Sequence, residues 1–311
     1  MAAFLKVEKM KVVFMGTPDF AVPVLERLIK EHEVVCVYTR EPKVAGRGNK
    51  VTKTPVHLVA EKYKIEVRTP KTLKDEKEQE AFRKLNADIS VVAAYGLILP
   101  KVIIEAFEKG CINVHASLLP RWRGAAPIQR SIEFGDKKSG VTIMQVVEAL
   151  DAGAMYKKGE VEITSLTTGG DLHDKLSTIG ADLMSEVLAD FDNIIPVEQD
   201  ESLVTYASKL DKDESRIDFN LEADVLERKI RAFNPFPAMF FEYQGERFKV
   251  LQAQITDMKA KAGEIIESEK SLIIGCKDKA LSIKQIQRQG KKPMQTEELL
   301  RGFCFCKGTV L

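Results

Sequence analysis

Short apolar runs alternate with amphipathic segments from residue 12 to residue 190, and this alternation restricts the possible folds more than any other feature. The clearest apolar runs cover residues 12–15, 34–38, 89–94 and 141–147, and helical patterns cover 20–30, 100–110 and 171–190. This order predicts a Rossmann-like α/β domain with a parallel sheet and helices on both faces. The first turn carries one glycine, Gly16, without G-x-G-x-x-G or P-loop spacing, which argues against a dinucleotide cofactor.

The periodicity changes after residue 237 to five short runs of alternating polarity. They cover 239–243, 248–255, 264–266, 272–274 and 281–289, with Gln244–Gly245 and Lys277–Asp278 as hairpin tips. Such strands predict a small antiparallel β-barrel, similar to an OB fold. Residues 192–209 contain Pro196 and many polar residues, as a linker does. We therefore predict an α/β domain over 1–191, a linker over 192–209 and a barrel domain over 210–311.

Composition excludes several classes of function. The formal net charge is +1, so any contact with nucleic acid must come from local basic clusters. The N-terminus lacks the apolar run of a signal peptide, and no run is long enough to span a membrane. The five cysteines are scattered, and the C-x-C spacing of Cys304 and Cys306 is not that of a zinc site. We expect no metal, no membrane contact and a cytoplasmic location.

Three polar residues share one face at the end of an otherwise apolar strand. Asn113, His115 and Ser117 are spaced i, i+2, i+4, and open α/β sheets bind ligands at this edge. Asp151 follows the next strand, and this connectivity can bring it to the same edge. His115 could instead be a core histidine and Asp151 an ordinary turn residue before Gly153. The asparagine and the Pro/Gly-rich loop after His115 favour a site.

These side chains suit acyl transfer to an amine. An asparagine amide and an imidazolium N–H can donate to the oxyanion of a tetrahedral intermediate. A carboxylate beside the histidine holds the orientation of its ring. The sequence shows no G-x-S-x-G motif and no Cys–His pairing, so it predicts direct attack by the substrate amine rather than a covalent acyl-enzyme.

Two basic clusters could bind phosphate, although both patterns are also typical of solvated surface. The long loop 39–53 contains Arg40, Lys43, Arg47, Lys50 and Lys53 against one acid, Glu41. Gly46 and Gly48 flank Arg47 and leave its backbone free. The predicted barrel carries Lys277, Lys279, Lys284, Arg288, Lys291 and Lys292. Small barrels commonly present such a face to nucleic acid.

Six segments together resemble the methionyl-tRNA formyltransferases over nearly the whole chain. They are GTPDF at 16–20, AGRG at 45–48, AYGLILP at 94–100, NVHASLLPRWRGAAPIQ at 113–129, LDAG at 150–153 and RAFNP at 231–235. The central segment also occurs in formyltransferases that act on glycinamide ribonucleotide and amino sugars. The first, second and last segments are more specific to the tRNA enzymes. The chain departs from the family pattern at Ala116, Val147, Ala149 and Ala154.

The resemblance implies formyl transfer from 10-formyltetrahydrofolate to the α-amine of initiator methionyl-tRNA by a monomeric enzyme. The family's catalytic positions correspond to Asn113, His115 and Asp151. Ser117, Leu118, Leu119 and Pro120 are expected to line the folate site. Arg47 and Lys50 in the loop, and Lys284 and Arg288 in the barrel, are expected to contact tRNA.

Two alternatives remain at this point. An amino-sugar-nucleotide formyltransferase would use the same folate donor but would not need the basic loop around Arg47. A non-enzymatic tRNA- or folate-binding protein would not need Asn113, His115 and Asp151 together. Glycinamide ribonucleotide is disfavoured as the acceptor because the enzymes that act on it lack the second domain.

Overall fold

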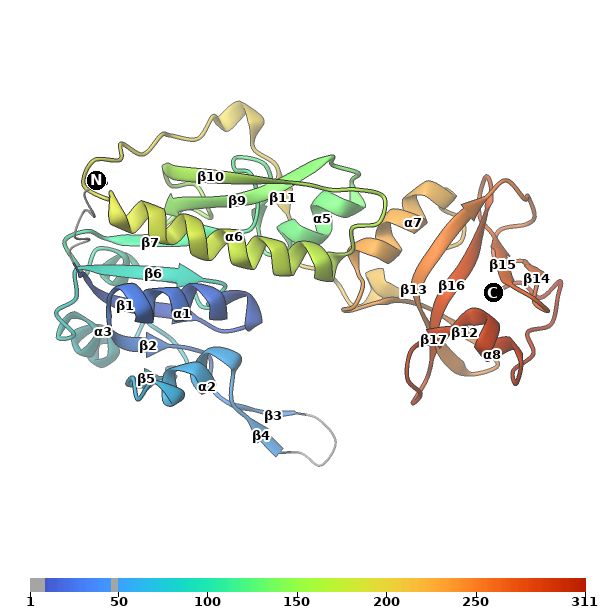
Figure 1. Cartoon of the computed structure of the whole chain (residues 1–311), viewed down its shortest axis with the longest axis horizontal. Coiled ribbons are helices and arrows are strands. Elements are labelled where there is room, and N and C mark those ends of the chain that lie inside the picture. The colour runs from blue at the N-terminus through green and yellow to red at the C-terminus, as the bar shows by residue number, and fades with distance from the viewer. Residues whose placement is uncertain (1–8, 46–49) are drawn as a thin grey trace, which may run out of the picture. The chain divides into compact units, whose positions relative to one another are not determined.

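The computed structural model describes residues 9–45 and 50–311 (Figure 1). Its first sheet has seven strands in the order β10-β9-β7-β6-β1-β2-β5. The strands are β1 Lys11–Gly16, β2 Glu33–Tyr38, β5 Val67–Arg68, β6 Ile89–Ala93, β7 Cys111–His115, β9 Lys138–Gln145 and β10 Met155–Glu162. Strands β5, β2, β1, β6 and β7 pair in parallel, which confirms the predicted Rossmann-like α/β fold class.

The sheet departs from the predicted parallel pairing at β9, although the fold class holds. This strand pairs antiparallel to β7, with Ile112 opposite Gln145 and His115 opposite Thr142. A parallel pair requires a connection that crosses back over the sheet, usually through a helix. The helix between these strands, α5 Pro127–Glu133, packs against α7 Ala223–Ala232 instead. The chain therefore enters β9 from the end of the sheet that it has just left.

Helices cover both faces of this sheet. On one face lie α1 Val22–Glu31 and α6 Gly169–Ala189 (Figure 1), where Ser177 Oγ donates to the carbonyl of Phe20 at 2.8 Å. A Cβ at Gly180 would lie 2.7 Å from Val114, so α6 approaches β7 closely. On the other face lie α3 Glu76–Arg83 and α4 Lys101–Ile104. The core there includes Val13, Met15, Cys36, Tyr38, Phe82, Ile103, Phe107 and Cys111.

The placement of helices on the two faces shows which way the side chains of β7 point. Val114 faces α6, and side chains alternate along a strand. Cys111, Asn113 and His115 therefore face the side of α4.

The remaining elements before residue 207 are short: η1 Asp19–Ala21, β3 Lys43–Ala45, β4 Lys50–Thr52, α2 Pro55–Lys62, β8 Arg123–Gly124 and η2 Glu201–Leu203. The strand β11 Tyr206–Ala207 follows them.

The second sheet is antiparallel and curves as a half-barrel, with the order β12-β13-β16-β15-β14 and β17 paired to β16. Its strands are β12 Met239–Tyr243, β13 Glu246–Thr256, β14 Ile265–Glu267, β15 Leu272–Gly275, β16 Ala280–Arg288 and β17 Met294–Gln295. The accompanying helices are η3 Asp213–Ser215, α7 Ala223–Ala232 and α8 Thr296–Leu300. Gln244 and Gly245 have φ values of 50° and 77°, which the tight β12–β13 turn requires. Both predicted hairpin tips connect neighbouring antiparallel strands.

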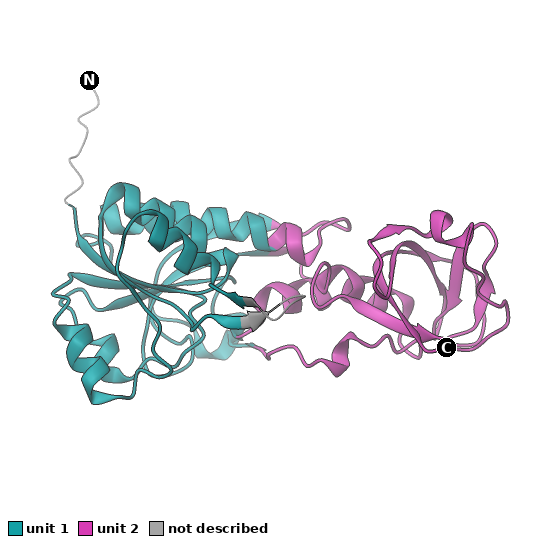
Figure 2. Cartoon of the chain, turned by 90° about the horizontal axis from the view of Figure 1, so that it is seen from below, with its two compact units in different colours: residues 1–124, 139–161, 173–206 teal, residues 125–138, 162–172, 207–311 magenta. Residues whose placement is uncertain are grey.

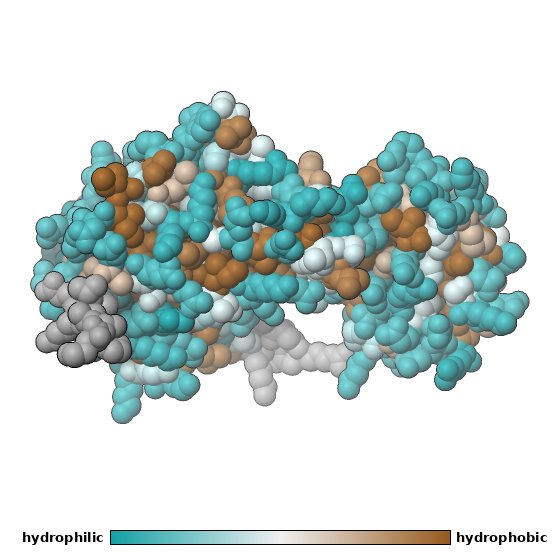
Figure 3. Space-filling view, turned by 45° about the horizontal axis from the view of Figure 1, so that its top comes forward, coloured by the Kyte–Doolittle hydropathy of each residue, from teal (hydrophilic) through white to brown (hydrophobic). Residues whose placement is uncertain are grey.

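The chain forms two compact units (Figure 2). The first contains residues 1–124, 139–161 and 173–206, and the second contains residues 125–138, 162–172 and 207–311. Most of the segment predicted as a linker thus packs within the first unit. No helix in the described part of the chain is long and apolar enough to cross a membrane. The face of the molecule in Figure 3 is largely hydrophilic, with hydrophobic residues in small groups.

Ion pairs fix residues 125–138 within the second unit. Arg130 on α5 is buried and donates two hydrogen bonds to the Glu214 carboxylate, at 2.7 and 2.9 Å. Arg130 also pairs with Glu133 at 2.7 Å. The hydrogen bonds from Arg130 lower the pKa of Glu214 to about 2. The side chain of Arg228 on α7 donates to the carbonyl of Glu133 at 3.1 Å, which ties α5 to α7.

Candidate active site

His115 and Asp151 lie together at the C-terminal end of β7, although β9 runs antiparallel and the loop after it has to return to this end. His115 is buried, and its Nδ1 is 3.7 Å from Oδ2 of Asp151. That distance is longer than a hydrogen bond, and the two groups form an ion pair only when the ring is protonated. The same Oδ2 accepts a hydrogen bond of 2.8 Å from the backbone N–H of Gly124. The carboxylate therefore has a fixed position beside the ring.

A backbone carbonyl fixes the histidine ring. Nε2 of His115 is 2.9 Å from the carbonyl oxygen of Trp122. Since a carbonyl can only accept, a proton must lie on Nε2. Nδ1 is then the atom that faces Asp151. Asn113 lies half-buried two residues earlier on the same face of β7. Sequence reasoning missed Trp122 and Gly124 because their contacts use backbone atoms, which leave no signal in side-chain patterns.

The loops that hold this pair have unusual backbone conformations. Asp151 has φ of 48° and Trp122 has φ of 67°, in the left-handed region that side chains other than glycine rarely adopt. Such conformations persist when surrounding contacts impose them, and they cluster at functional sites. The loop 146–154 also has to run back from the end of β9, where Val146 N–H donates to the carbonyl of Cys111. Its path brings Asp151 to His115.

Ser117, Leu118 and Leu119 contact β9 or β10, and the carbonyl of Pro120 accepts a hydrogen bond from the backbone N–H of Thr205. Ser117 is buried, and its Oγ donates to the carbonyl of Arg121 at 2.6 Å. Leu119 is buried with Met144 and Met155. These four residues are not among those that line the pocket beside β7 described next. Their assignment to the folate site stays a prediction.

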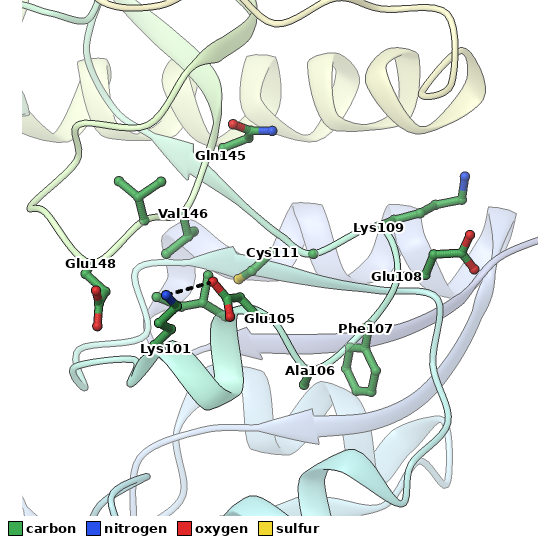
Figure 4. A pocket seen from close by; sticks show the side chains of 13 residues that line it. Lys101, Glu105, Ala106, Phe107, Glu108, Lys109, Cys111, Gln145, Val146 and Glu148 are labelled. Carbon is green, nitrogen blue, oxygen red and sulfur yellow. Dashed lines mark ion pairs between the residues drawn. The ribbon is translucent and has the colours of Figure 1, made fainter.

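A pocket of about 720 Å³ lies between α4, the start of β7 and the end of β9 (Figure 4). Its lining residues are Lys101, Ile104, Glu105, Ala106, Phe107, Glu108, Lys109, Gly110, Cys111, Gln145, Val146, Val147 and Glu148. Cys111 occupies the same face of β7 as Asn113. Val146 to Glu148 begin the loop that leads to Asp151. Asn113, His115 and Asp151 are not among its lining residues, and the pocket lies toward the start of β7, whereas His115 lies at its C-terminal end.

Two family models match the chain: formyl transferase over residues 10–188, and formyl transferase, C-terminal domain, over residues 209–304. The methionyl-tRNA formyltransferase of Paramagnetospirillum magneticum is 49% identical over 306 residues, covering 97% of this chain and 100% of that protein. The methionyl-tRNA formyltransferase of Novosphingobium aromaticivorans is 48% identical, again over 97% and 100%. The chain belongs to the methionyl-tRNA formyltransferase family.

Solved structures with low identity share the fold of this family member. An N-formyltransferase from Helicobacter canadensis, in complex with folinic acid and dTDP-3-aminofucose, aligns with a TM-score of 0.68 and 20% identity over 88% of this chain and 99% of its own. HypX from Aquifex aeolicus, in complex with tetrahydrofolic acid, aligns with a TM-score of 0.65 and 16% identity. That alignment covers 94% of this chain and 47% of HypX, so this chain spans about half of HypX. At these identities the likeness shows the fold alone.

The four residues that the family resemblance assigns to tRNA differ in their surroundings. Arg47 lies outside the described residues, and only the backbone of Lys50 in β4 is described. Lys284 on β16 is exposed and lines a pocket of about 900 Å³ in the second unit. Arg288 pairs with Glu246 at 2.5 Å and lies over the Phe303 ring. This ion pair lowers the pKa of Glu246.

The cysteines are all free thiols. Cys36, Cys111 and Cys276 are buried, and Cys304 and Cys306 are exposed. Burial raises the pKa of Cys36 to about 12, so its thiolate is disfavoured. Within residues 9–45 and 50–311, no group of three or more His, Cys, Asp or Glu side chains is placed to hold a metal ion.

Proposed function

We propose that this formyltransferase moves the formyl group of 10-formyltetrahydrofolate to the α-amine of initiator methionyl-tRNA. The observation that carries the proposal is the pair of His115 and Asp151 at the end of β7, with Asn113 on the same face of the strand. The relatives of nearly half-identical sequence that carry the name methionyl-tRNA formyltransferase support this acceptor.

The pocket beside β7 suits the pteridine end of the donor. It combines apolar side chains, such as Ile104 and Val146, with backbone and polar groups that can bond to a flat heterocycle. Cys111 in this pocket precedes Asn113 by two residues, a separation of about 7 Å along a strand. A folate whose ring fills the pocket can therefore extend toward Asn113 and His115. Ser117 to Pro120, which follow His115 along the chain, would then form the loop next to the formyl group.

The reaction follows from these positions. The methionyl amine attacks the formyl carbon, and a new C–N bond forms as the carbonyl oxygen becomes an oxyanion. The Asn113 amide donates to this oxygen, as does the Nδ1–H of protonated His115, whose Nε2–H stays bonded to the Trp122 carbonyl. Asp151 lies beside the ring. The bond between the formyl carbon and N10 of the folate then breaks. The proton lost by the amine ends on N10, and no covalent enzyme intermediate forms.

An amino-sugar nucleotide is the alternative acceptor. The structural likeness to a sugar N-formyltransferase, at 20% identity, supports a shared fold and not a shared acceptor. Steady-state formylation of methionyl-tRNA beside a dTDP-amino sugar, with the same folate donor, tests the proposal. We expect turnover of methionyl-tRNA only. Turnover of the sugar nucleotide without that of methionyl-tRNA would refute it. That the enzyme is monomeric and located in the cytoplasm stays a prediction.

Lys284→Glu should weaken tRNA binding more than Arg288→Glu does. Lys284 is exposed, and no ion pair involves it within the described part of the chain. Arg288 is already paired with Glu246. Since the release of counterions follows the number of phosphates neutralised, loss of one contact should lower the salt slope by about 1. Binding titrations at several salt concentrations measure both effects. Equal affinity and slope in Lys284→Glu and the parent would show that this face is only solvated surface.

Arg47 should matter for tRNA and not for folate. A guanidinium can bind phosphate bidentately or stack on a base, which an ammonium cannot copy. We therefore expect Arg47→Lys to lower kcat/KM for methionyl-tRNA and Arg47→Ala to lower it further. Calorimetric binding of a folate analogue should stay unchanged in both variants. Normal kcat/KM in Arg47→Ala, or a matching loss of folate affinity, would refute the assignment.

A further inference from the structure

Gln199 lies in the segment predicted as a linker, yet its side chain contacts the loop of Asp151. Its residue is buried, with 7% of its surface exposed. Nε2 donates to the carbonyl of Asp151 at 2.8 Å and to the carbonyl of Gly153 at 2.9 Å. The two amide protons of Gln199 thus bond to two carbonyls that lie two residues apart in one turn of the loop. A single side chain thus fixes two peptide groups next to the candidate catalytic carboxylate.

Arg123 fixes the orientation of Gln199. It is also buried, and its Nε donates to Oε1 of Gln199 at 3.0 Å. Because arginine can only donate, Oε1 must face Arg123 and Nε2 must face the two carbonyls. The guanidinium is held in turn by Glu201, with contacts of 2.7 and 3.3 Å. Every hydrogen-bonding atom of the Gln199 amide therefore has a defined partner.

The segment that contains Arg123 also holds the carboxylate of Asp151 directly. Gly124, the residue after Arg123, donates its backbone N–H to Oδ2 of Asp151. Asp151 itself has a positive φ, a conformation that persists only when its surroundings impose it. A Cβ at Gly153 would lie 2.1 Å from the carbonyl oxygen of Gln145, so the loop also packs closely there. Gln199 bonds to both of these constrained residues.

We propose that Gln199, oriented by Arg123, is a positioning residue that sets the Asp151 carboxylate against His115. It touches neither substrate, and it acts through the backbone of Asp151 and Gly153. The inference rests on the proposed function, since formyl transfer is the activity in which Asp151 takes part. A displacement of about 1 Å at a catalytic group can lower a rate by roughly 100-fold.

The test is Gln199→Glu, which keeps the size of the side chain and its acceptor for Arg123. A carboxylate cannot donate to the carbonyls of Asp151 and Gly153, and its charge repels them. We expect kcat to fall about 10-fold or more, with the KM values for methionyl-tRNA and folate nearly unchanged. Gln79→Glu is the matched control, because Gln79 also donates to a backbone carbonyl, that of Leu73, but lies on α3. A kcat equal to that of the control would overturn the proposal.

A double-mutant cycle with Asp151→Asn separates positioning from general destabilisation. If Gln199 acts through Asp151, Gln199→Glu should cost little further rate once the carboxylate is gone. The proposal would be overturned if Gln199→Glu lowered kcat by the same factor in the parent and in Asp151→Asn. A rise in KM at unchanged kcat would also overturn it. Gln199→Met, which is neutral and of similar length, is judged by the same criteria if Gln199→Glu does not fold.

Hydrogen exchange separates this proposal from the proposed function. Amides of residues 147–154 should exchange faster in Gln199→Met than in the parent, whichever acceptor the enzyme uses. Unchanged exchange would refute the positioning role. Failure of the parent protein to formylate methionyl-tRNA would refute the proposed acceptor alone, and the kinetic comparison would then use the acceptor that is turned over.

Discussion

Asn113→Ala is expected to lower kcat for formyl transfer by about 100- to 1,000-fold, the usual cost of losing one oxyanion donor. The amide of Asn113 lies on the same face of β7 as the fixed ring of His115. Its contribution arises as the carbonyl oxygen gains charge, so it stabilises the transition state more than bound folate. Single-turnover formyl transfer measures the rate, and calorimetry measures the affinity for a folate analogue.

Asn193→Ala is the matched control for that variant, because Asn193 is exposed and bonds to Asp190 away from the catalytic pair. Its rate should equal that of the parent. The oxyanion role fails if Asn113→Ala changes the rate by less than about 10-fold, since loss of a preorganised donor costs more than that. It fails equally if the loss of rate is matched by a loss of folate affinity.

Asp151→Asn should lower kcat by about 100-fold or more, in the range that acid–base groups contribute. The carboxylate lies 3.7 Å from Nδ1 of His115 and is itself held by Gly124. An asparagine can keep the bond from Gly124 through its oxygen, but it then offers no negative charge to the ring. Rapid-quench kinetics give the rate. Ring nitrogen chemical shifts of His115 report the change in its surroundings.

A second His–Asp pair provides the control for Asp151→Asn. His173 and Asp174 lie 2.9 Å apart on α6, with the Asp174 side chain 86% exposed. Asp174→Asn should leave kcat unchanged. If Asp151→Asn has the same rate as Asp174→Asn, the carboxylate does not serve the reaction. Unchanged ring nitrogen shifts of His115 would show that the two groups are not coupled.

Local patterns predicted much of this fold because they reflect local physics. The parallel strands β1, β2, β6 and β7, and the turn at Gln244–Gly245, follow from periodicity and from glycine's freedom of φ. His115 and Asp151 meet as predicted, but through the return of the loop 146–154 rather than through parallel strands. The direction of β9 did not follow from local patterns, because it depends on where α5 packs. That packing involves contacts distant in sequence, such as those of Arg228 with the carbonyl of Glu133 and of Arg130 with Glu214.

The environment of the site was less predictable than its side chains. The partners of His115 and Asp151 include backbone atoms of Trp122 and Gly124. Gln199 lies in a polar stretch that resembles a linker, since a single buried amide does not alter composition. The pocket beside β7 had one available signal: Cys111 precedes Asn113 by two residues and so shares its face. Its other walls come from segments that meet only after folding.

Rapid-quench transfer from a labelled formyl donor to methionyl-tRNA tests the central claim most directly. The enzyme is mixed in excess with 10-formyltetrahydrofolate carrying label in its formyl group, with and without methionyl-tRNA. We predict label in N-formylmethionine when the acceptor is present, and no label on the protein when it is absent. Failure to label methionine, or a labelled enzyme that precedes the product, would contradict direct attack by the methionyl amine at Asn113, His115 and Asp151.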